Sequence, residues 1–314
     1  MQLIRRPGSG RPALPGGCVA TIGTFDGVHL GHQRIIARVV EEARRRGLPA
    51  VVFSFEPTPA EFFSPGRPPP RLTRFREKFV ALAELAVDCF FCPPFDAAME
   101  SLSPAAFIQR WLLEALQVQH LVVGDDFRFG HRRAGGFAEL QQAAAEHGFG
   151  IERAESVVVD GQRVSSTAIR EALAAGELER ARRLLGRYYR MLGRVVPGRR
   201  LGARLGFPTA NVRLNRRAVA LSGIFAVRVH GLPESPVDGV ASLGYRPTVD
   251  RDGTLLLEVH LFDFDRDIYG EHIGVDFVAR LRDERRFDDL DSLVEQMHED
   301  AAQARALLAA ADEE

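Results

Sequence analysis

A glycine-rich turn joins a short apolar segment to a helical one near the start of this 314-residue chain. Residues 18–22 (CVATI) are apolar and partly β-branched, which predicts a buried strand, and residues 33–46 repeat apolar side chains at helical spacing. Between them, Gly23, Gly27 and Gly31 allow a sharp turn and a close approach to a ligand. Because the start of a helix presents unbonded N–H groups and a positive dipole end, the turn predicts an anion-binding site.

Two histidines in this turn indicate phosphate chemistry. His29 and His32 are three residues apart, so we expect them on one face of the first helical turn, where two imidazoles can stabilise charge on a triphosphate. One histidine in a core or capping role is an alternative, and so is a zinc pair, although no further ligand follows at metal-binding spacing. The HLGH run resembles the HxGH signature of the nucleotidyltransferase superfamily, which implies nucleotidyl transfer with release of pyrophosphate.

The composition argues against several classes of function. A content of 46% apolar and 26% charged residues indicates a soluble globular protein, and a net charge of −1 provides no whole-chain attraction to nucleic acid or an anionic membrane. Lys78 is the single lysine, which excludes a GxxxxGK[ST] phosphate loop. The N-terminal residues carry no hydrophobic signal core and no apolar run reaches about 18 residues, so we expect neither secretion nor a membrane span. We therefore expect small-molecule partners, no nucleic acid, no membrane, and a monomer or weak homo-oligomer.

The cysteines predict a reducing compartment. Cys18, Cys89 and Cys92 are an odd number without a secretory framework of disulfides. Cys89 and Cys92 form a CxxC pattern, but they lie in a strand-like run, where residues three apart face opposite sides. We interpret them as buried thiols in a cytoplasmic protein.

The sequence pattern changes at about residue 185. Before it, strand and helix alternate, with strands expected at 50–55, 88–91, 120–123 and 151–159 and helices at 104–116 and 137–147. After it, short β runs are expected at 189–196, 223–230, 240–243, 255–262 and 274–281, followed by a helix at 289–308. We predict an α/β domain with a mainly parallel sheet over residues 1–185. An antiparallel β-barrel domain with a C-terminal helix is predicted over residues 186–314.

A second turn in the first domain carries a carboxylate and two aromatic residues. The segment 123–130 (VGDDFRFG) follows a predicted strand, so fold logic brings it to the same edge of the sheet as the histidines. Asp126 can hold a hydrated Mg²⁺ or a ribose hydroxyl, and Phe127 or Phe129 offers a flat surface for a ring. For at least one phenylalanine, packing in the core is the alternative.

The segment 163–170 (RVSSTAIR) combines hydroxyls with two arginines where a helix should begin. A serine or threonine at this position caps a helix in any protein. Arg163 and Arg170 are also fixed cations near a helix N-terminus, which suits β- and γ-phosphates. We therefore predict both a cap and a phosphate contact here.

The second domain has its own candidate site. Residues 202–211 form a glycine-punctuated loop in which Pro208 restricts the backbone, and Thr209 and Asn211 can ligate Mg²⁺ beside a nucleotide. Glu258 is a carboxylate in an otherwise apolar strand, which makes it a candidate base for deprotonating an alcohol. A surface carboxylate at the barrel rim is the alternative.

Five motifs together resemble one family in order and over almost the whole chain. They are GTFDGVHLGHQ, GDDFRFG, RVSSTAIR, LGFPTAN and EVHLFDFDRDIYG, and they resemble the prokaryotic bifunctional riboflavin kinase/FAD synthetase family. The resemblance implies an FMN adenylyltransferase domain of nucleotidyltransferase type, then a riboflavin kinase barrel. It implies FMN formation from riboflavin and ATP, then FAD formation from FMN and a second ATP, with Mg²⁺. A nucleotidyltransferase for another acceptor with a non-catalytic flavin-binding barrel, and a flavin-sensing or nucleic-acid-binding protein, are the alternatives.

The resemblance also implies roles for residues of the first domain. His29 and His32 would bind and neutralise the phosphates of ATP. The other residues implied at this ATP site are Gly23, Thr24, Phe25, Asp126, Arg163, Ser166, Thr167 and Arg170, and those near the flavin ring are Phe55, Pro57, Phe62 and Phe129. Two of these depart from the family pattern, since Thr24 stands where many members have Asn and Asp126 where some have Asn.

In the barrel, the resemblance implies that Glu258 is the base acting on the terminal ribityl hydroxyl. The residues implied for ATP are Gly202, Gly206, Pro208, Thr209 and Asn211, of which Thr209 and Asn211 would also hold Mg²⁺. Arg282 resembles the arginine of a ligand-responsive loop and is expected near the flavin.

Overall fold

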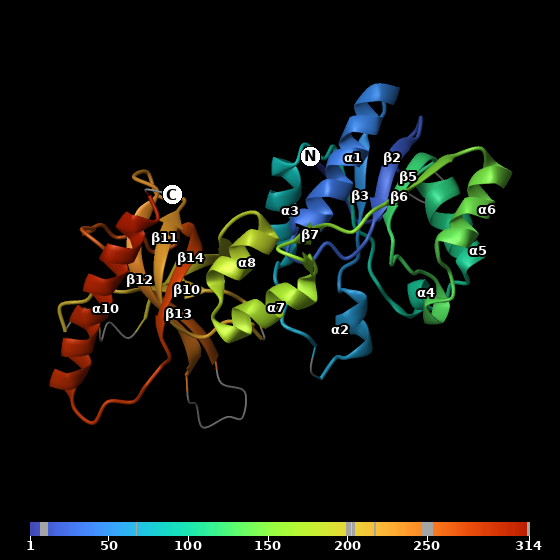
Figure 1. Ribbon diagram of the computed structural model, residues 1–314. Helices are drawn as coiled ribbons and strands as arrows, with labels where there is room; N and C mark the ends of the chain where they lie inside the picture. The colour runs from blue at the N-terminus through green and yellow to red at the C-terminus, as the bar shows by residue number, and fades with distance from the viewer. Residues whose placement is uncertain are drawn as a thin grey trace. The chain divides into compact units, whose positions relative to one another are not determined.

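The computed structural model describes residues 1–6, 12–66, 68–198, 202, 205–216, 218–246 and 254–312 (Figure 1). The chain divides into two compact units. Unit 1 consists of Met1–Pro69 and Thr73–Ser165, and unit 2 consists of Pro70–Leu72 and Ser166–Glu314.

Unit 1 is built on a parallel sheet of six strands in the order β1-β4-β3-β2-β5-β6. In that order the strands are Gln2–Ile4, Cys89–Phe91, Ala50–Phe53, Cys18–Ile22, Val118–Gly124 and Gly150–Ala154. From β2 the chain runs outward through β3 to β4, which lies beside the edge strand β1, and then returns to the other side of β2 with β5. The carboxyl ends of β2 and β5 therefore form the switch point at which parallel sheets bind ligands.

Helices cover both faces of this sheet (Figure 1). Alternation along β2 sends Cys18 and Ala20 into the larger apolar core, and Val19 into a core shared with Val39 and Ala43 of α1 (Leu30–Arg46). The first face is covered by α5 (Pro104–Phe107), η1 (Ile108–Ala115) and α6 (Phe137–His147), and the second by α1 and α3 (Phe75–Glu84). The predicted α/β class is confirmed.

Some elements of unit 1 differ from the sequence prediction. The helix expected over 104–116 continues from α5 into a π-helix, η1, which apolar spacing alone does not distinguish from an α-helix. The strand expected at 151–159 is divided into β6, which pairs with β5, and a separate β7 (Val158–Val159). Strand β7 pairs instead with β8 (Gln162–Arg163) in a tight hairpin whose turn residues, Asp160 and Gly161, are both at positive φ. The remaining short elements of this unit are α2 (Pro59–Phe63), α4 (Ala97–Glu100) and η2 (His131–Arg133).

Unit 2 contains a closed barrel of six antiparallel strands in the order β10-β13-β12-β11-β14-β9. In that order they are Ala210–Arg213, Thr254–Leu261, Val237–Arg246, Gly223–His230, His272–Arg282 and Tyr189–Val196. The predicted barrel is confirmed, but the five predicted strands omit β10, which lies at the end of the segment interpreted as a loop. This strand was missed because it is short, and it closes the barrel by pairing with both β9 and β13.

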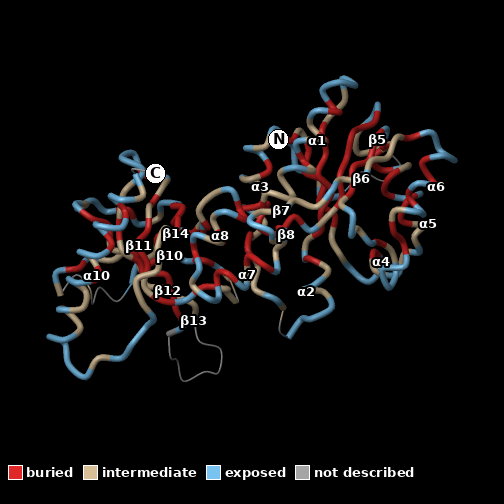
Figure 2. Tube along the Cα trace, viewed as in Figure 1, coloured by how far each residue is buried: buried red, intermediate tan, exposed pale blue. Residues whose placement is uncertain are grey.

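The strands of the barrel carry many buried residues (Figure 2), and most of these are apolar. Along β13, Leu257, Val259 and Leu261 are buried, whereas Glu258 and His260 alternate with them and lie on the outer face. Helix α10 (Leu290–Ala310) packs on the outside of the barrel, in agreement with the predicted C-terminal helix. None of the helices in the described parts of the chain combines the length and hydropathy of a transmembrane span.

Two helices precede the barrel strands in unit 2. They are α7 (Ser166–Ala175) and α8 (Leu178–Leu185), and α8 packs against β14 and β9. The division between compact units therefore lies before these helices, whereas the predicted domain boundary lies after them. The functional boundary at residues 185 and 186 stays a prediction.

Candidate functional site

The turn after β2 holds His29 and His32 side by side. His29 is the N-cap of α1, and its Nδ1 accepts a hydrogen bond from the His32 N–H at 3.3 Å. The two rings stack with centroids 3.6 Å apart and an interplanar angle of 16°. Because Nδ1 of His29 accepts, the neutral ring carries its proton on Nε2. The structure thus brings the two predicted phosphate-binding histidines together on one face.

Two residues of this turn have positive φ angles, which residues other than glycine rarely adopt. Phe25 and Val28 have φ of 49° and 44°, in the left-handed region, where a non-glycine residue costs about 1 kcal/mol or more. Gly31 is needed for space rather than for its φ angle, because a Cβ there would lie 3.2 Å from Cε1 and Nδ1 of His29. The absence of a side chain at Gly31 leaves room for the His29 ring.

A separate segment fixes this turn from behind. Thr73 donates from its N–H and its Oγ1 to Oδ1 of Asp26, at 2.9 and 3.3 Å, and Thr73 Oγ1 accepts from the Gly27 N–H at 2.9 Å. Lys78 donates from Nζ to the carbonyl of Thr24 at 2.6 Å. Neither Thr73 nor Lys78 is part of a predicted site, because both are distant from the turn along the chain.

A cluster of charged side chains lies at the carboxyl end of β5. Arg163 NH2 lies 2.9 Å from both Asp125 Oδ1 and Asp126 Oδ2, and Ser156 Oγ donates to Asp125 Oδ2 at 2.7 Å. Asp126 and Arg163, both predicted for the ATP site, are therefore in direct contact. Asp125 and Ser156 were not predicted, and they hold the Arg163 side chain in place.

This charged group lies next to the histidine turn. A Cβ at Gly124 would be 3.6 Å from Oδ1 of Asp126 and 3.7 Å from Cδ1 of Ile35 in α1. A Cβ at Gly31 would be 3.8 Å from the carbonyl of Val164, the residue after Arg163. The two histidines, Asp126 and Arg163 thus gather at the switch point of the sheet.

The other three residues of the predicted ATP site belong to unit 2. Ser166, Thr167 and Arg170 lie in the first turns of α7. Arg170 donates from Nε to the carbonyl of Pro70 at 2.8 Å, within the same unit. Their contribution to adenylyl transfer stays a prediction.

The predicted flavin residues of unit 1 form part of an aromatic cluster. Phe95 contacts both Phe55 and Phe62, with ring centroids 5.5 and 5.3 Å away. Phe55 is buried, and the neighbouring Phe63 is 62% exposed, so the cluster extends from the core to the surface. Pro57, reached by a cis peptide bond from Glu56, lies in the turn between β3 and α2.

Phe129 connects to the same cluster through the core. Its ring lies 5.3 Å from Phe107, which stacks on Phe53 at 5.9 Å, and Phe53 lies 5.0 Å from Phe55. Phe127 stacks on Phe129 at 5.6 Å with an angle of 12°. Phe129 is 6% exposed, so most of its surface is occupied by packing.

In unit 2 the strand register brings the predicted kinase residues together. Asn211 of β10 lies directly opposite Glu258 of β13, and Ser242 of β12 lies opposite Glu258 on its other side. Directly opposed residues of an antiparallel pair point to the same face with Cβ atoms about 5 Å apart. The carboxylate predicted as the base is therefore flanked by an amide and a hydroxyl on the outer face of the barrel.

A glycine makes room for Asn211. A Cβ at Gly198 would lie 2.1 Å from Nδ2 and 2.5 Å from Cγ of Asn211, so no other residue fits there without displacing the amide. The Asn211 side chain is buried despite its position on the outer face. Gly198 was not predicted, and its only signal in the sequence is its place after Pro197 in a loop.

The loop before Thr209 depends on both of its predicted glycines. A Cβ at Gly202 would lie 2.3 Å from the carbonyl of Phe207, whose N–H donates to the carbonyl of Gly202 at 2.8 Å. The same Cβ would lie 3.4 Å from Oγ1 of Thr209. Gly206 has φ of 82°, which favours glycine. These positions therefore set the shape of the loop that leads to Thr209.

The segment after the loop is anchored to the barrel by a histidine. Nδ1 of His260 donates to the carbonyl of Pro208 at 2.8 Å, and the ring of Phe207 lies against His260 and against His298 of α10. Pro208 is exposed. This anchoring fixes the backbone just before Thr209.

A second carboxylate lies near Glu258. Glu284, in the segment after β14, accepts a hydrogen bond from Ser242 Oγ at 3.3 Å. A Cβ at Gly244 would lie within 2.2 Å of both Glu284 carboxylate oxygens, so Gly244 provides the space for this group. Ser242 and Glu284 were not predicted, because strand register brings Ser242 opposite Glu258 and a hydrogen bond to Ser242 brings Glu284 to the same place.

Arg282 makes a bidentate ion pair with α10. Its Nε and NH2 lie 2.8 and 2.7 Å from the two carboxylate oxygens of Asp300, which is 4% exposed. Its NH1 donates to the carbonyl of Asp283 at 3.0 Å. The structure therefore gives the arginine predicted near the flavin a clear structural contact, and its flavin role stays a prediction.

The donor groups around Asn211 fit a hard cation. A threonine hydroxyl, an amide oxygen and a carboxylate are oxygen ligands of the kind that Mg²⁺ accepts together with phosphate oxygens. The described residues contain no cluster of three His, Cys, Asp or Glu side chains suited to hold a metal ion by themselves. A cation at this site would therefore depend on the phosphates of a bound nucleotide for much of its coordination.

The cysteines are buried thiols, as interpreted from the sequence. Cys18, Cys89 and Cys92 are all free and buried. Burial raises the pKa of the Cys89 thiol to about 11, with a smaller contribution from the nearby Asp88 carboxylate. The CxxC pattern therefore contributes to packing rather than to redox chemistry at neutral pH.

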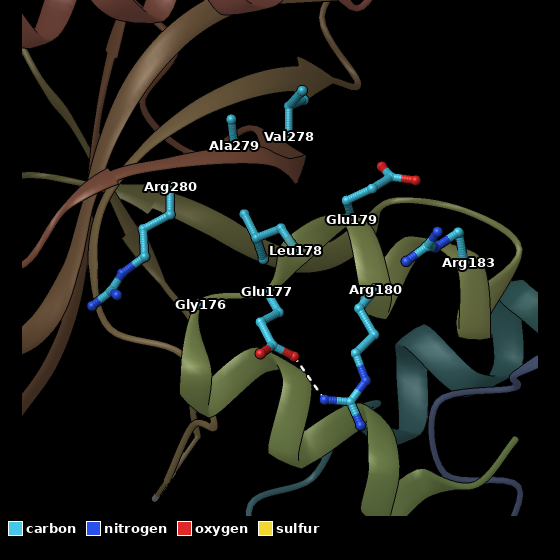
Figure 3. A pocket seen from close by; sticks show the side chains of 9 residues that line it. All are labelled: Gly176, Glu177, Leu178, Glu179, Arg180, Arg183, Val278, Ala279 and Arg280. Carbon is cyan, nitrogen blue, oxygen red and sulfur yellow. Dashed lines mark hydrogen bonds and ion pairs between the residues drawn. The ribbon is translucent and has the colours of Figure 1, made fainter. Parts of the chain in front are cut away.

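A cavity of about 660 Å³ in unit 2 lies apart from these groups (Figure 3). It is lined by Gly176, Glu177, Leu178, Glu179, Arg180, Arg183, Val278, Ala279 and Arg280. Arg180 is paired with Glu177 at 2.7 Å, and the head groups of Arg280 and Arg183 point in different directions. The cavity contains none of the predicted site residues, and its charged groups do not converge on a common point.

Comparison with known sequences gives matches to both halves of the chain. The profile of the family described as FAD synthetase matches residues 11–168, and that of riboflavin kinase matches residues 185–308. A bifunctional riboflavin kinase/FMN adenylyltransferase of Pseudomonas fluorescens is 49% identical over 309 residues, covering 98% of each chain. The proteins of the same name from Escherichia coli K12 and Haemophilus influenzae are 47% and 43% identical, each covering at least 97% of both chains.

A solved structure has a similar fold. A crystal structure from Streptococcus pneumoniae, described as a macrolide-efflux protein, aligns with a TM-score of 0.84 and 29% identity. The alignment covers 96% of this chain and 97% of that one.

Proposed function

Because the chain belongs to the bifunctional riboflavin kinase/FMN adenylyltransferase family, it is a transferase that converts riboflavin to FMN and FMN to FAD. We propose that the two reactions use two sites, one based on the histidine turn of unit 1 and the other on the Asn211–Glu258 pair of unit 2. ATP is the co-substrate of both reactions. The observation that carries the proposal is the separation of the two sets of groups. The histidine turn lies in unit 1 and in the FAD synthetase match, whereas the Asn211–Glu258 pair lies in unit 2 and in the riboflavin kinase match.

In adenylyl transfer, a phosphate oxygen of FMN attacks the α-phosphorus of ATP and the bond to pyrophosphate breaks. FMN is already an anion, so this step needs charge stabilisation rather than a base. His29 and His32 stabilise the charge that develops on the phosphates, together with the N-terminus of α1, and each donor contributes about 3 kcal/mol. Arg163, held in place by Asp125 and Asp126, presents a guanidinium beside the turn that can donate hydrogen bonds to a phosphate.

In phosphoryl transfer, the terminal ribityl hydroxyl attacks the γ-phosphorus of ATP and ADP leaves. Glu258 accepts the hydroxyl proton as the new P–O bond forms. Asn211 lies opposite Glu258 across the strand pair, so the ATP-binding side chain and the base share one face. Thr209 and Asn211 would hold Mg²⁺ with the phosphates, where the bound ion supplies charge neutralisation.

Two other functions are less well supported. A nucleotidyltransferase with a non-catalytic barrel would not need a carboxylate beside Asn211 and a glycine cradle for that amide. The efflux described for the Streptococcus pneumoniae structure is not carried over, because identity to it is 29%, against 43% or more for the three relatives with both transferase activities in their names.

The remaining predictions concern the setting of the enzyme. We propose that it acts in the cytoplasm, since its three cysteines are free thiols that suit a reducing compartment. We further propose that its partners are small molecules without nucleic acid, and that it is a monomer or a weak homo-oligomer. Sedimentation velocity over a range of protein concentrations tests the oligomeric state.

The central experiment follows the flavins over time. The purified chain is incubated with riboflavin, ATP and Mg²⁺, and FMN is expected to appear before FAD. His29→Ala should lower FAD formation by about 10²- to 10³-fold while FMN still accumulates. Glu258→Gln should lower FMN formation by about 10²- to 10⁴-fold while supplied FMN is still adenylylated. Loss of both reactions in either variant, in a protein that remains folded, would contradict the assignment of one site to each unit.

A further inference from the structure

A single buried lysine lies behind the histidine turn. Lys78 is the only lysine of the chain, and its side chain in α3 is 1% exposed. An ammonium group loses its hydration when buried, and this cost is several kcal/mol unless polar groups replace the water. The desolvation of the Lys78 ammonium therefore costs free energy that its contacts in unit 1 must offset.

The ammonium is bonded to the turn itself. Lys78 Nζ donates to the carbonyl of Thr24 at 2.6 Å and lies 3.5 Å from Ser54 Oγ. Ser54 Oγ donates to the same carbonyl at 3.2 Å. The Thr24 carbonyl therefore accepts two hydrogen bonds, one of which is charge-assisted and so about twice as strong as a neutral one.

This carbonyl controls the unusual backbone of the turn. The Thr24 carbonyl and the Phe25 N–H belong to one peptide group, and rotation of that group about the N–Cα bond is the φ angle of Phe25. That angle is 49°, a left-handed value that costs free energy for a phenylalanine. A bond from Lys78 to the carbonyl therefore restrains the torsion that sets the direction of the chain toward His29.

The ammonium also changes the electrostatics of the turn. A cation bonded to a carbonyl polarises the amide and makes its N–H a stronger donor. The turn also contains the buried carboxylate of Asp26, which would repel phosphate, and the positive charge of Lys78 offsets this repulsion near the N-terminus of α1. Thr73 restrains the same loop through Asp26 and Gly27 but adds no charge.

We infer that Lys78 is a positioning residue for adenylyl transfer, which fixes the Thr24–Phe25 peptide and so the approach of the phosphates to His29 and His32. The inference rests on the proposed function of unit 1. It assigns no contact between Lys78 and a substrate, because the side chain is buried behind the turn.

The test compares Lys78→Met with the unaltered chain in both reactions. The loss of a charge-assisted hydrogen bond predicts a decrease of about tenfold to a hundredfold in kcat/KM for adenylylation of supplied FMN. We expect kcat to fall and KM for ATP to rise, with KM for FMN changed less than about twofold, because the aromatic cluster and not the turn is proposed to bind the flavin ring. Riboflavin phosphorylation in the same preparation should be unchanged.

Two further variants separate positioning from folding. Lys78→Arg keeps the charge, so its decrease in log kcat/KM should be at most about half of the decrease caused by Lys78→Met. Ser54→Ala removes the weaker bond to the same carbonyl and should cost less than about threefold. The emission of Trp111, the only tryptophan and a core residue of unit 1, reports whether this unit is folded at the assay temperature.

Three results would overturn the inference. They are adenylylation by Lys78→Met within twofold of the unaltered chain, an equal rise in KM for ATP and FMN, and a Lys78→Arg variant as inactive as Lys78→Met with native Trp111 emission. If the Trp111 emission shows that Lys78→Met is unfolded, the KM values of Lys78→Arg for ATP and for FMN decide the question. His29→Ala distinguishes a wrong site from a wrong role for Lys78. If His29→Ala leaves FAD formation intact, the proposed site is wrong. If it abolishes FAD formation and Lys78→Met does not lower it, only the positioning role is wrong.

Discussion

The two units assemble their candidate sites in different ways. In unit 1, His29 and His32 are neighbours along the chain, and a turn at the end of a parallel strand places them at the switch point of the sheet. In unit 2, Asn211 and Glu258 are far apart along the chain and meet because β10 and β13 are paired in one register. A loop site is therefore visible as a continuous motif, whereas a site on strands becomes visible only when the register is known.

The two sites also differ in what their geometry requires. The turn of unit 1 includes two non-glycine residues at positive φ, Phe25 and Val28, and it is held by bonds from Thr73 and Lys78. The pair in unit 2 lies in regular strands, and the special feature is the space that Gly198 leaves for Asn211. Unit 1 depends on a restrained backbone, and unit 2 depends on room for one side chain. The following predictions test this contrast.

The largest effect is expected from Gly198→Ala. The new Cβ would lie 2.1 Å from Nδ2 of Asn211 and must displace the amide, and a displacement of about 1 Å in a reacting site costs about a hundredfold in rate. We expect FMN formation to fall by about this factor, measured from initial rates with riboflavin and ATP. FAD formation from supplied FMN is the internal control and should be unchanged. An unchanged kinase rate would show that Asn211 does not depend on this space.

The next effect concerns Arg282 and its ion pair. Asp300→Ala leaves the guanidinium without its buried partner, which should cost about 2 kcal/mol, less than for a fully buried pair because the Arg282 side chain is 21% exposed. The unfolding temperature of unit 2, followed by circular dichroism, should fall by about 4 to 8 °C while the Trp111 transition stays in place. Glu299→Ala, at an exposed neighbouring position, is the control. A change in KM for riboflavin larger than about threefold, without loss of stability, would instead favour the predicted flavin role.

A smaller effect is expected from Gly31→Ala in unit 1. Its Cβ would lie 3.2 Å from the His29 ring, so the ring must move by a few tenths of an ångström. We expect FAD formation to fall by about threefold to tenfold, which is less than for Gly198→Ala because the contact is less severe. Gly66→Ala, where a Cβ meets open space, is the matched control. Equal activity of the two variants would mean that the room beside His29 is not needed.

The smallest effect is expected from pH. Burial, and then the charge of Arg46, lower the pKa of His120, so the folded unit 1 takes up a proton less readily than the unfolded chain. This contribution to stability is complete above about pH 6.5, the ordinary value for histidine, and is lost as the pH falls below it. The Trp111 transition should therefore shift to lower temperature between about pH 7.5 and pH 5. His120→Gln should make this dependence shallower, and an identical slope in both proteins would exclude His120 as its cause.

Much of the fold could be predicted because its signals are local. The parallel sheet, the barrel and the C-terminal helix follow from apolar spacing, and the observed β2, β9, β11 and α6 have the predicted bounds. The errors occur where spacing carries no distinguishing signal. Strand β10 is short and lies in a loop-like sequence, and the π-helix η1 buries the same kind of apolar face as an α-helix.

The sites show the same limit. The pattern of glycines and histidines was enough to predict the turn, and the structure brings His29, His32, Asp126 and Arg163 to one edge of the sheet. Lys78 was recognised only as the single lysine, with no position relative to the turn. Ser242 and Glu284 carried no signal, since neither residue type is unusual in a strand or loop.

The sequence by itself determined the two classes of domain, the order in which they occur, and the residue types that handle phosphate, because periodicity, glycine turns and reactive side chains are local properties of the chain. Only the tertiary structure decided which residues support them. The Asn211–Glu258 pair, the room left by Gly198 and the bond from Lys78 to Thr24 all join segments far apart in the sequence. Such contacts depend on strand register and on packing between elements, and a local pattern contains neither.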